Sequence, residues 1–164
     1  MKLLTKLSFL VIITVLSFSC SPESLNDKAD ALIENIEAPT PKSIELEILK
    51  LINNHRLSKG MNPLKSMTII KTTAFTHTDY MVDTQTVSHA NFFTRSNYLK
   101  SNAGAKSVSE NVAYGFSSAK SVVDAWMRSE SHKKNIEGDF TDFEVSAEKD
   151  SDDKWYFTNI FIKK

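Results

Sequence analysis

The chain has 164 residues, of which 20 are basic and 20 acidic, so its formal net charge is zero. This balance excludes the strongly basic surface that nucleic-acid binding requires, and we expect no nucleic-acid partner. A single cysteine excludes an internal disulfide, so a folded domain has to be held together by its hydrophobic core.

Residues 1–20 predict a signal peptide. Lys2 and Lys6 precede an apolar run at residues 9–18, which is too short for a typical transmembrane helix. Cys20 ends the sequence LSFSC, which resembles a bacterial lipobox, in which the cysteine is lipidated and becomes the new N-terminus. Simple cleavage near this point and a buried N-terminal helix are the alternatives. Both signal interpretations predict an exported protein, either a cell-envelope lipoprotein attached to a membrane through Cys20 or an extracellular protein.

Residues 21–41 are acidic and contain prolines at positions 22, 39 and 41. This segment lacks the apolar content to fold alone, and it predicts a flexible tether. Residues 42–164 remain, which is enough for one compact domain.

Two helices are predicted at the start of this domain. Thr40 and Pro41 are typical of a helix start, and apolar residues then recur at helical spacing until Gly60. A second helix is expected over about residues 66–83. Residues 84–108 are polar and irregular, and they predict a long functional or mobile loop.

The C-terminal part of the domain predicts one more helix and a β-hairpin. Residues 109–116 are expected to form a turn or a short strand. Ser117 or Ser118 can cap a third helix, and residues 129–136 are expected to add a short extra turn. The segments FEVSAE and KWYFTNIFI predict two antiparallel strands. Both faces of the second strand are apolar, which favours helices on both sides of the sheet and an α+β fold.

Four histidines and one glutamate are the candidates for a functional site. His55 and His77 lie on or near apolar helical faces and are expected to be satisfied core or boundary residues. His89 and His132 lie in polar segments, SHAN and SESHKKN, where the alternatives are solvated surface residues or a paired role. Glu110, in SENVAYG, could join them as a metal ligand, a general base or the partner that fixes a histidine tautomer. Neither HExxH nor CxxC occurs, so the fold would have to assemble such a site.

Four segments together resemble the bacterial branch of the CAP superfamily, the SCP/TAPS group of cysteine-rich secretory, antigen 5 and pathogenesis-related proteins. They are NNHRLSKGMNPL, SHANFFTR, SENVAYGFSSAKSVVDAWMRSESHKKNI and WYFTNIF. The resemblance covers roughly residues 42–162, and its most specific parts are the Glu-Asn of SENVAYG and the Trp-x-x-Ser-x-x-His of WMRSESH. It implies a three-layer α-β-α sandwich with a small antiparallel sheet between helices.

The resemblance also implies a central cleft. His89 matches the first cleft histidine of the family, Glu110 the acid of the Glu-Asn motif, and His132 the second histidine of bacterial members. Ser129 occupies the position of a second acid in animal members, so the identity of that acid is open here. Some family members bind zinc or another divalent ion between the two histidines, which would make His89 and His132 metal ligands.

The neighbours of these residues receive supporting roles by the same resemblance. Asn111 is expected to bond loop backbone, and Arg95 to pack and pair near the cleft. Phe92 or Phe93 is expected to anchor the loop that presents His89.

Three functions are compatible with this resemblance. The first, which we favour, is an exported, lipid-anchored binding module without enzymatic activity, whose ligand is a lipid or sterol, a polysaccharide or a protein. The second is a zinc-dependent hydrolase in which Glu110 activates water, although two histidines leave zinc short of the usual three protein ligands. The third is a structural role, in which the polar cluster only fastens the loops to the third helix.

Overall fold

The structure is a computed structural model that describes residues 36–164. The predicted signal peptide, Cys20 and most of the predicted tether lie outside the described residues. Residues 36–42 form neither helix nor strand. The elements that follow are α2 (Ser43–Ser58), β1 (Lys65–Ser66), α3 (Thr68–Asp83), α4 (Phe92–Ala103), β2 (Ser107–Tyr114), α5 (Ala119–Arg128), α6 (Glu130–Ile136), β3 (Asp142–Lys149) and β4 (Trp155–Lys163). Among the described helices, none has the length and apolar character needed to cross a membrane.

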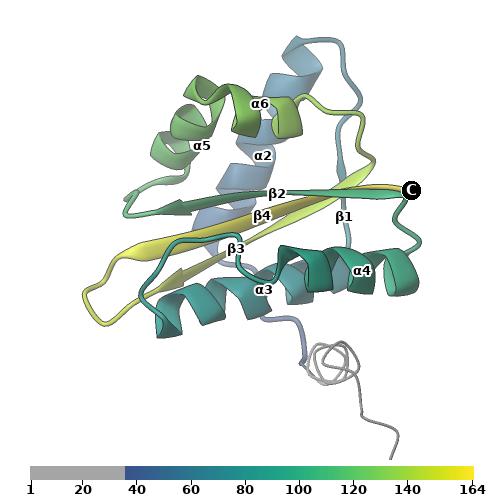
Figure 1. Ribbon diagram of the computed structural model, residues 1–164. Coiled ribbons are helices and arrows are strands. Elements are labelled where there is room, and N and C mark those ends of the chain that lie inside the picture. Colours follow the sequence, from purple (N-terminus) through teal and green to yellow (C-terminus); the bar gives the residue numbers. More distant parts are fainter. Residues whose placement is uncertain (1–35) are drawn as a thin grey trace, which may run out of the picture.

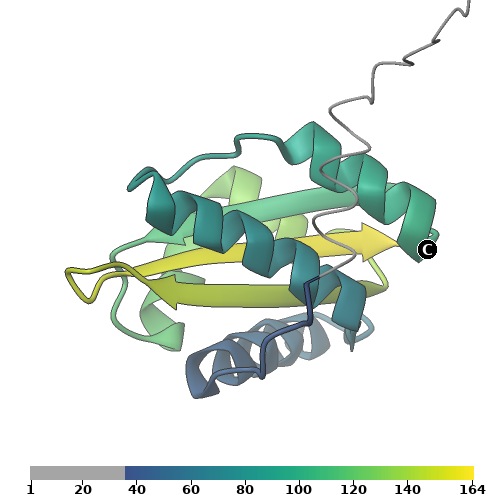
Figure 2. The same cartoon turned by 90° about the horizontal axis from the view of Figure 1, so that it is seen from below.

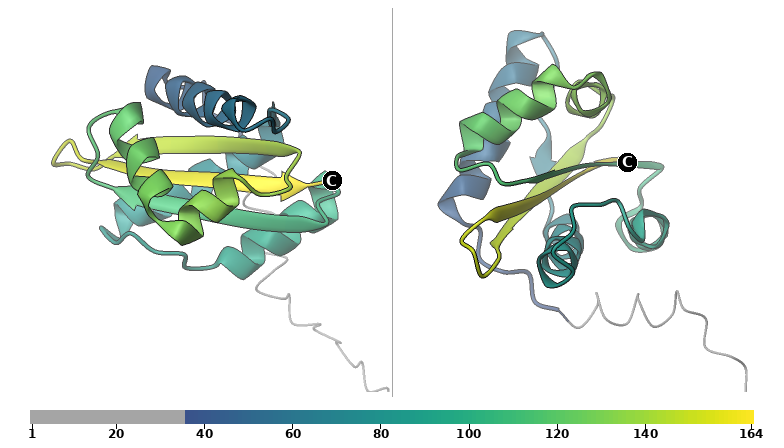
Figure 3. Two further views of the ribbon diagram at one scale, coloured as in Figure 1. Left: turned by 90° about the horizontal axis from the view of Figure 1, so that it is seen from above. Right: turned by 60° about the vertical axis from the view of Figure 1, so that its left-hand side comes forward.

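A sheet lies between two layers of helices (Figure 1), which confirms the predicted α-β-α sandwich. The strand order is β1-β3-β4-β2. Helices α2, α5 and α6 cover one face, called here the α2 face, and α3 and α4 cover the other, called the α3 face (Figures 2 and 3). The predicted antiparallel hairpin is β3–β4, and β2 adds to β4 antiparallel. The sheet is nevertheless mixed, because the two-residue strand β1 runs parallel to β3.

Helix starts agree with the sequence in one case and differ in another. Ser118 caps α5 as predicted, since its side chain accepts a hydrogen bond from the backbone N–H of Ser121. The predicted start of the first helix at Thr40 and Pro41 is wrong by two residues, because α2 begins at Ser43. The carboxylate of Glu45 accepts the backbone N–H of Lys42 at 2.7 Å, and this side chain caps the helix in place of the Thr40 hydroxyl.

The predicted loop at residues 84–108 is wrong, because it contains α4 and the start of β2. Buried positions recur along α4 at helical spacing, but two of them are the polar residues Arg95 and Ser96. Phe93, by contrast, is 77% exposed, so it does not anchor the loop as expected. Polar residues therefore interrupt the apolar periodicity by which a helix is predicted from sequence. A buried arginine needs a charged partner, and that partner lies elsewhere in the chain.

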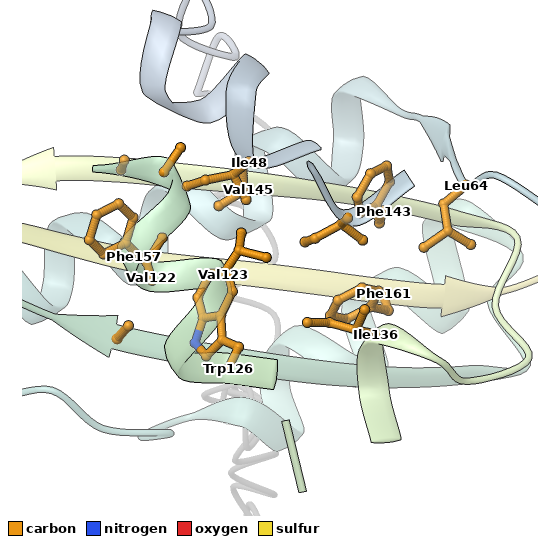
Figure 4. Packing of buried hydrophobic residues seen from close by; sticks show 14 residues of the cluster. Ile48, Leu64, Val122, Val123, Trp126, Ile136, Phe143, Val145, Phe157 and Phe161 are labelled. Atoms are coloured by element: carbon orange, nitrogen blue, oxygen red, sulfur yellow. The ribbon is translucent and has the colours of Figure 1, made fainter. Parts of the chain in front are cut away.

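The larger hydrophobic core lies on the α2 face (Figure 4). Trp126 of α5 belongs to this core and meets Phe157 of β4 edge-on, with ring centroids 6.5 Å apart. Ile48 and Ile52 of α2 are fully buried against the same cluster. A smaller core on the α3 face is formed by Ile70, Ala74, Tyr98, Leu99, Ala103, Ala105, Ile160 and Ile162. The two cores fix both helical layers to the sheet without a disulfide.

A buried ion pair covers the free part of the β3 edge. Glu45 of α2 accepts the backbone N–H of Ala147 at 2.7 Å and lies 2.6 Å from the ammonium group of Lys71 on α3. Lys71 donates in turn to the carbonyl of Val145 at 3.0 Å. Side chains from both helical layers thus satisfy backbone groups that β3 would otherwise offer to another strand.

The candidate site at the edge of β2

Strand β2 is the other edge of the sheet, and side chains of α5 and α6 cover part of it. The indole N–H of Trp126 donates to the carbonyl of Val112 at 3.1 Å. The amide of Asn135 donates to the carbonyl of Glu110 at 3.2 Å. Since both carbonyls point away from β4, the WMRSESHKKN segment lies along the outer edge of β2 and is fixed to it.

Asn111 joins this edge to α6 from the α2 face. Its amide donates to the backbone carbonyl of His132 at 3.1 Å, and its side-chain oxygen accepts from Asn135 at 2.8 Å. The side chain is fully buried, so it fixes the backbone at His132 rather than contacting a ligand. Asn111 therefore has the backbone-bonding role that the family resemblance implies.

Glu110 points to the opposite face, where its carboxylate is surrounded by donors. The guanidinium of Arg95 donates two hydrogen bonds to it, of 2.9 and 2.8 Å. Nδ1 of His89 lies 2.9 Å from one carboxylate oxygen. The Glu110 side chain is 1% exposed, so its charge is compensated inside the protein and not by water.

The loop that carries His89 is fixed at three further points. His77 of α3 lies 2.8 Å, through Nε2, from the carbonyl of Ser88, and its ring stacks on Tyr80. Arg95 also donates to the carbonyl of Ala90 at 2.6 Å. Asn91 adopts a left-handed conformation with φ of 57°, which asparagine tolerates, and the chain then enters α4.

These contacts determine which nitrogen of His89 faces outward. A carboxylate can only accept, so Nδ1 of His89 is the donor to Glu110. In the neutral ring Nε2 then carries a lone pair, and the side chain is 52% exposed. The hydrogen bond to Glu110 thus holds the exposed imidazole of His89 in a fixed orientation.

Two buried groups have shifted pKa values. Burial favours the protonated form of Glu110, but the hydrogen bond from His89 and the charge of Arg95 outweigh it and lower the pKa of the carboxyl. Burial and the nearby charge of Arg95 lower the pKa of His77, whose Nε2 is 3.9 Å from Glu110. At neutral pH the cluster therefore holds a charged Glu110–Arg95 pair and a neutral His77.

His132 approaches the cluster from α6, on the other side of the β2 edge. It is half-buried, and burial together with the proximity of His89 lowers its pKa. Ser129 lies between α5 and α6, and its hydroxyl is 3.1 Å from that of Ser131. Within residues 36–164, Ser129 makes no contact with either histidine or with Glu110 that would complete a tetrad.

The donors present do not fit a zinc centre. Structural zinc takes four protein ligands and catalytic zinc three. Within the described residues, no group of three or more His, Cys, Asp or Glu side chains is arranged to hold a metal ion. The carboxylate of Glu110 is 1% exposed and already accepts three hydrogen bonds from Arg95 and His89, so among the described residues it does not form a three-ligand group with the two imidazoles.

The sequence predicted His77 to be a core or boundary residue and did not predict that it supports the site. It is buried and bonded, as expected of a core histidine, and His55 is likewise satisfied by Glu137 at 2.8 Å. Its spacing of seven residues from Ile70 and three from Ala74 placed it on the buried side of α3. The bond to Ser88 makes it part of the support for His89, and only the folded loop reveals this contact.

The family model described as the cysteine-rich secretory protein family (CAP) matches residues 49–161. The uncharacterized protein YkwD of Bacillus subtilis is 29% identical over 126 residues; the match covers 72% of this chain and 49% of YkwD, so the chain spans about half the length of that relative.

Solved structures show the same fold. An outer surface protein from Borrelia burgdorferi has a TM-score of 0.67 at 21% identity, with 79% of this chain and 99% of that one covered. An extracellular SCP-domain protein from Bacillus anthracis has a TM-score of 0.64 at 24% identity, with 88% and 45% covered. These likenesses agree with the family match, which extends over more than half of the sequence. The chain belongs to the CAP family of cysteine-rich secretory proteins.

Proposed function

We propose that this CAP domain is an exported binding module that recognises its ligand at the β2 edge through His89 and His132 and does not turn it over. The ligand would be a lipid, a polysaccharide or a protein. The observation that carries the proposal is that the carboxylate of Glu110 is buried and accepts three hydrogen bonds from Arg95 and His89. A carboxylate with a lowered pKa that is shielded from solvent is a poor general base.

The same observation argues against the hydrolase alternative. Water activation by zinc needs a metal with three protein ligands and an open position, and a nearby base that can take a proton. Glu110 is committed to Arg95, and Ser129 is bonded to Ser131. What the cluster can supply instead is a fixed, exposed hydrogen-bond acceptor at His89 beside a second imidazole.

Export and membrane attachment rest on the N-terminal sequence and on relatives. The basic residues, the short apolar run and Cys20 in LSFSC favour secretion with lipidation. Two proteins with this fold are described as an outer surface protein and an extracellular protein. We therefore place the domain outside the cytoplasm, attached to a membrane through a lipidated Cys20.

The binding proposal is tested with the full chain in a mild non-ionic detergent. Phosphatidylglycerol nanodiscs and a soluble chitin oligosaccharide serve as lipid and polysaccharide probes, and an extracellular pull-down under matched conditions tests a protein ligand. Imidazole resonances of both histidines are followed by NMR. We expect one probe to shift both resonances, and the His89→Ala, His132→Ala variant to lose binding while it still folds, at a somewhat lower melting temperature because Glu110 loses the hydrogen bond from His89. Chelator-sensitive hydrolysis of any probe, or binding that the double variant retains, would refute the proposal.

Membrane attachment is tested separately by expressing wild type and Cys20→Ser in a bacterial host. Lipidation predicts that the wild-type chain sediments with membranes and carries a diacylglycerol mass at Cys20. The Cys20→Ser variant should lose both. Soluble wild-type protein cleaved near Cys20 would instead support simple secretion.

A further inference from the structure

A cavity lies at the end of the sheet where the β3–β4 hairpin turns. Its volume is about 460 Å³, and residues 85–87, Tyr114, Tyr156, Asp150 and Asp152 line it. In Figure 2 the yellow hairpin, the end of β2 and the segment that follows α3 meet at this end of the molecule. None of the lining residues belongs to the histidine cluster, although residues 85–87 lead directly to Ser88 and His89.

Two tyrosines form the aromatic side of this cavity. Tyr114 and Tyr156 are cross-strand partners at the ends of β2 and β4, and their ring centroids are 4.4 Å apart. Tyr156 is buried beneath its partner, whereas Tyr114 is 43% exposed. An exposed tyrosine ring with a rigid aromatic support is a surface on which a cation can be held by its attraction to the ring.

Two aspartates of the hairpin give the cavity its charge. Asp150 accepts the backbone N–H groups of Asp152 and Lys154 with one oxygen, at 3.0 and 2.9 Å, which fixes the carboxylate and leaves its other oxygen available. Lys149 is paired with Asp153 and not with either lining aspartate. Among the described residues, no lysine, arginine or histidine lines the cavity, so the charged side chains of its lining are the two carboxylates.

The third side belongs to the segment after α3. Val87 is 45% exposed there and supplies an apolar side chain beside the polar Gln85 and Thr86. A hydrated metal cation would gain nothing from Val87 and Tyr114, and an anion would be repelled by the two aspartates. A neutral sugar could stack on Tyr114 but would leave both carboxylate charges unpaired. The combination fits a cation that carries its charge on an aliphatic chain.

We propose that this cavity binds an organic ammonium ion of the polyamine type, with the ammonium group between Tyr114 and the two aspartates and the alkyl chain along Val87. The site is separate from the histidine cluster, so the proposal does not depend on the function proposed above.

The test is a calorimetric titration of the full chain in detergent with spermidine at low ionic strength, against three variants. Asp150→Asn with Asp152→Asn removes the charge but keeps the acceptor that the hairpin requires. Tyr114→Leu removes the ring at an exposed position. Asp153→Asn is the control, since it removes one carboxylate charge from the same hairpin at a residue that does not line the cavity.

We expect one spermidine per chain, with affinity reduced at least about tenfold in the double aspartate variant and about threefold in Tyr114→Leu. Asp153→Asn should bind within about twofold of wild type, and melting curves should show that all variants fold. Three results would overturn the proposal: no saturable binding below about 10 mM spermidine, equal weakening by Asp153→Asn, or full competition by equimolar magnesium.

Discussion

Arg95, in the first turn of α4, binds Glu110 of β2 through two hydrogen bonds of 2.9 and 2.8 Å, and both side chains are almost completely buried. The pair joins a helix of the α3 face to the edge strand. Both residues also bind the loop that contains His89. The removal of one partner of such a pair leaves an uncompensated charge inside the protein.

Arg95→Leu should therefore destabilise the fold strongly. We expect a loss of about 3–5 kcal/mol in the free energy of unfolding, measured by urea denaturation. Arg128→Leu is the control, because Arg128 is exposed in the last turn of α5, and it should change stability by less than about 0.5 kcal/mol. Similar effects of the two variants would contradict a stabilising role for the pair.

Stability should fall in two stages as the pH decreases. The pKa of His77 is below its ordinary value of 6.5, so the unfolded chain takes up that proton first and stability begins to decline below about pH 6.5. The pKa of the Glu110 carboxyl is also lowered, from an ordinary value of 4.5. Stability therefore falls a second time as the pH drops below 4.5 and through the folded-state pKa of Glu110.

Two variants separate these stages in melting curves recorded from pH 7 to pH 3. His77→Gln should flatten the first stage, and Glu110→Gln the second. His132 also has a lowered pKa, so His132→Gln is measured beside them to identify its contribution. An unchanged profile in His77→Gln would show that another group controls the first stage.

The buried pair Glu45–Lys71 should stabilise the fold to a degree similar to that of the Arg95–Glu110 pair. Lys71→Met leaves Glu45 with two backbone donors and the more distant ammonium group of Lys42 at 4.0 Å, and we expect a loss of about 3 kcal/mol. Adding Glu45→Gln to that variant should restore part of the loss, because the buried charge is removed as well. A double-mutant cycle by urea denaturation measures the coupling, and additive effects of the two changes would refute it.

The indole hydrogen bond to β2 can be tested without creating a large cavity. Trp126→Phe keeps an aromatic ring in the main core but leaves the carbonyl of Val112 without its donor. We expect a loss of about 1–3 kcal/mol, combining the lost bond with a smaller ring. A comparison with Trp155→Phe serves as the control, because Trp155 is only partly buried and its indole has no such role. Equal losses would assign the effect to ring size alone.

Much of the fold could be predicted because its signals are local. Helical periodicity predicted α2 and α3, Ser118 predicted the start of α5, and alternation predicted the β3–β4 hairpin. The helix α4 could not be predicted in the same way. Its buried face includes Arg95, and a buried arginine is tolerated only because Glu110, 15 residues later, compensates its charge.

The site was partly predictable for a related reason. His89, Glu110 and His132 were singled out by motif, and the structure brings His89 into contact with Glu110 while placing His132 across the strand edge. The support from His77 depends on how the loop folds back onto α3. No spacing rule links a helical histidine to a backbone carbonyl eleven residues away.

The chain enters the domain beside β3, where Lys42 meets Glu45 and pairs with Glu148. The two histidines lie at the opposite edge, beyond β4 and β2, which is roughly 10 Å across the sheet at ordinary strand spacing. If the domain is attached to a surface through its N-terminal segment, His89 and His132 lie on the side away from the point of attachment. Both histidines would then remain accessible to soluble molecules that diffuse to that surface.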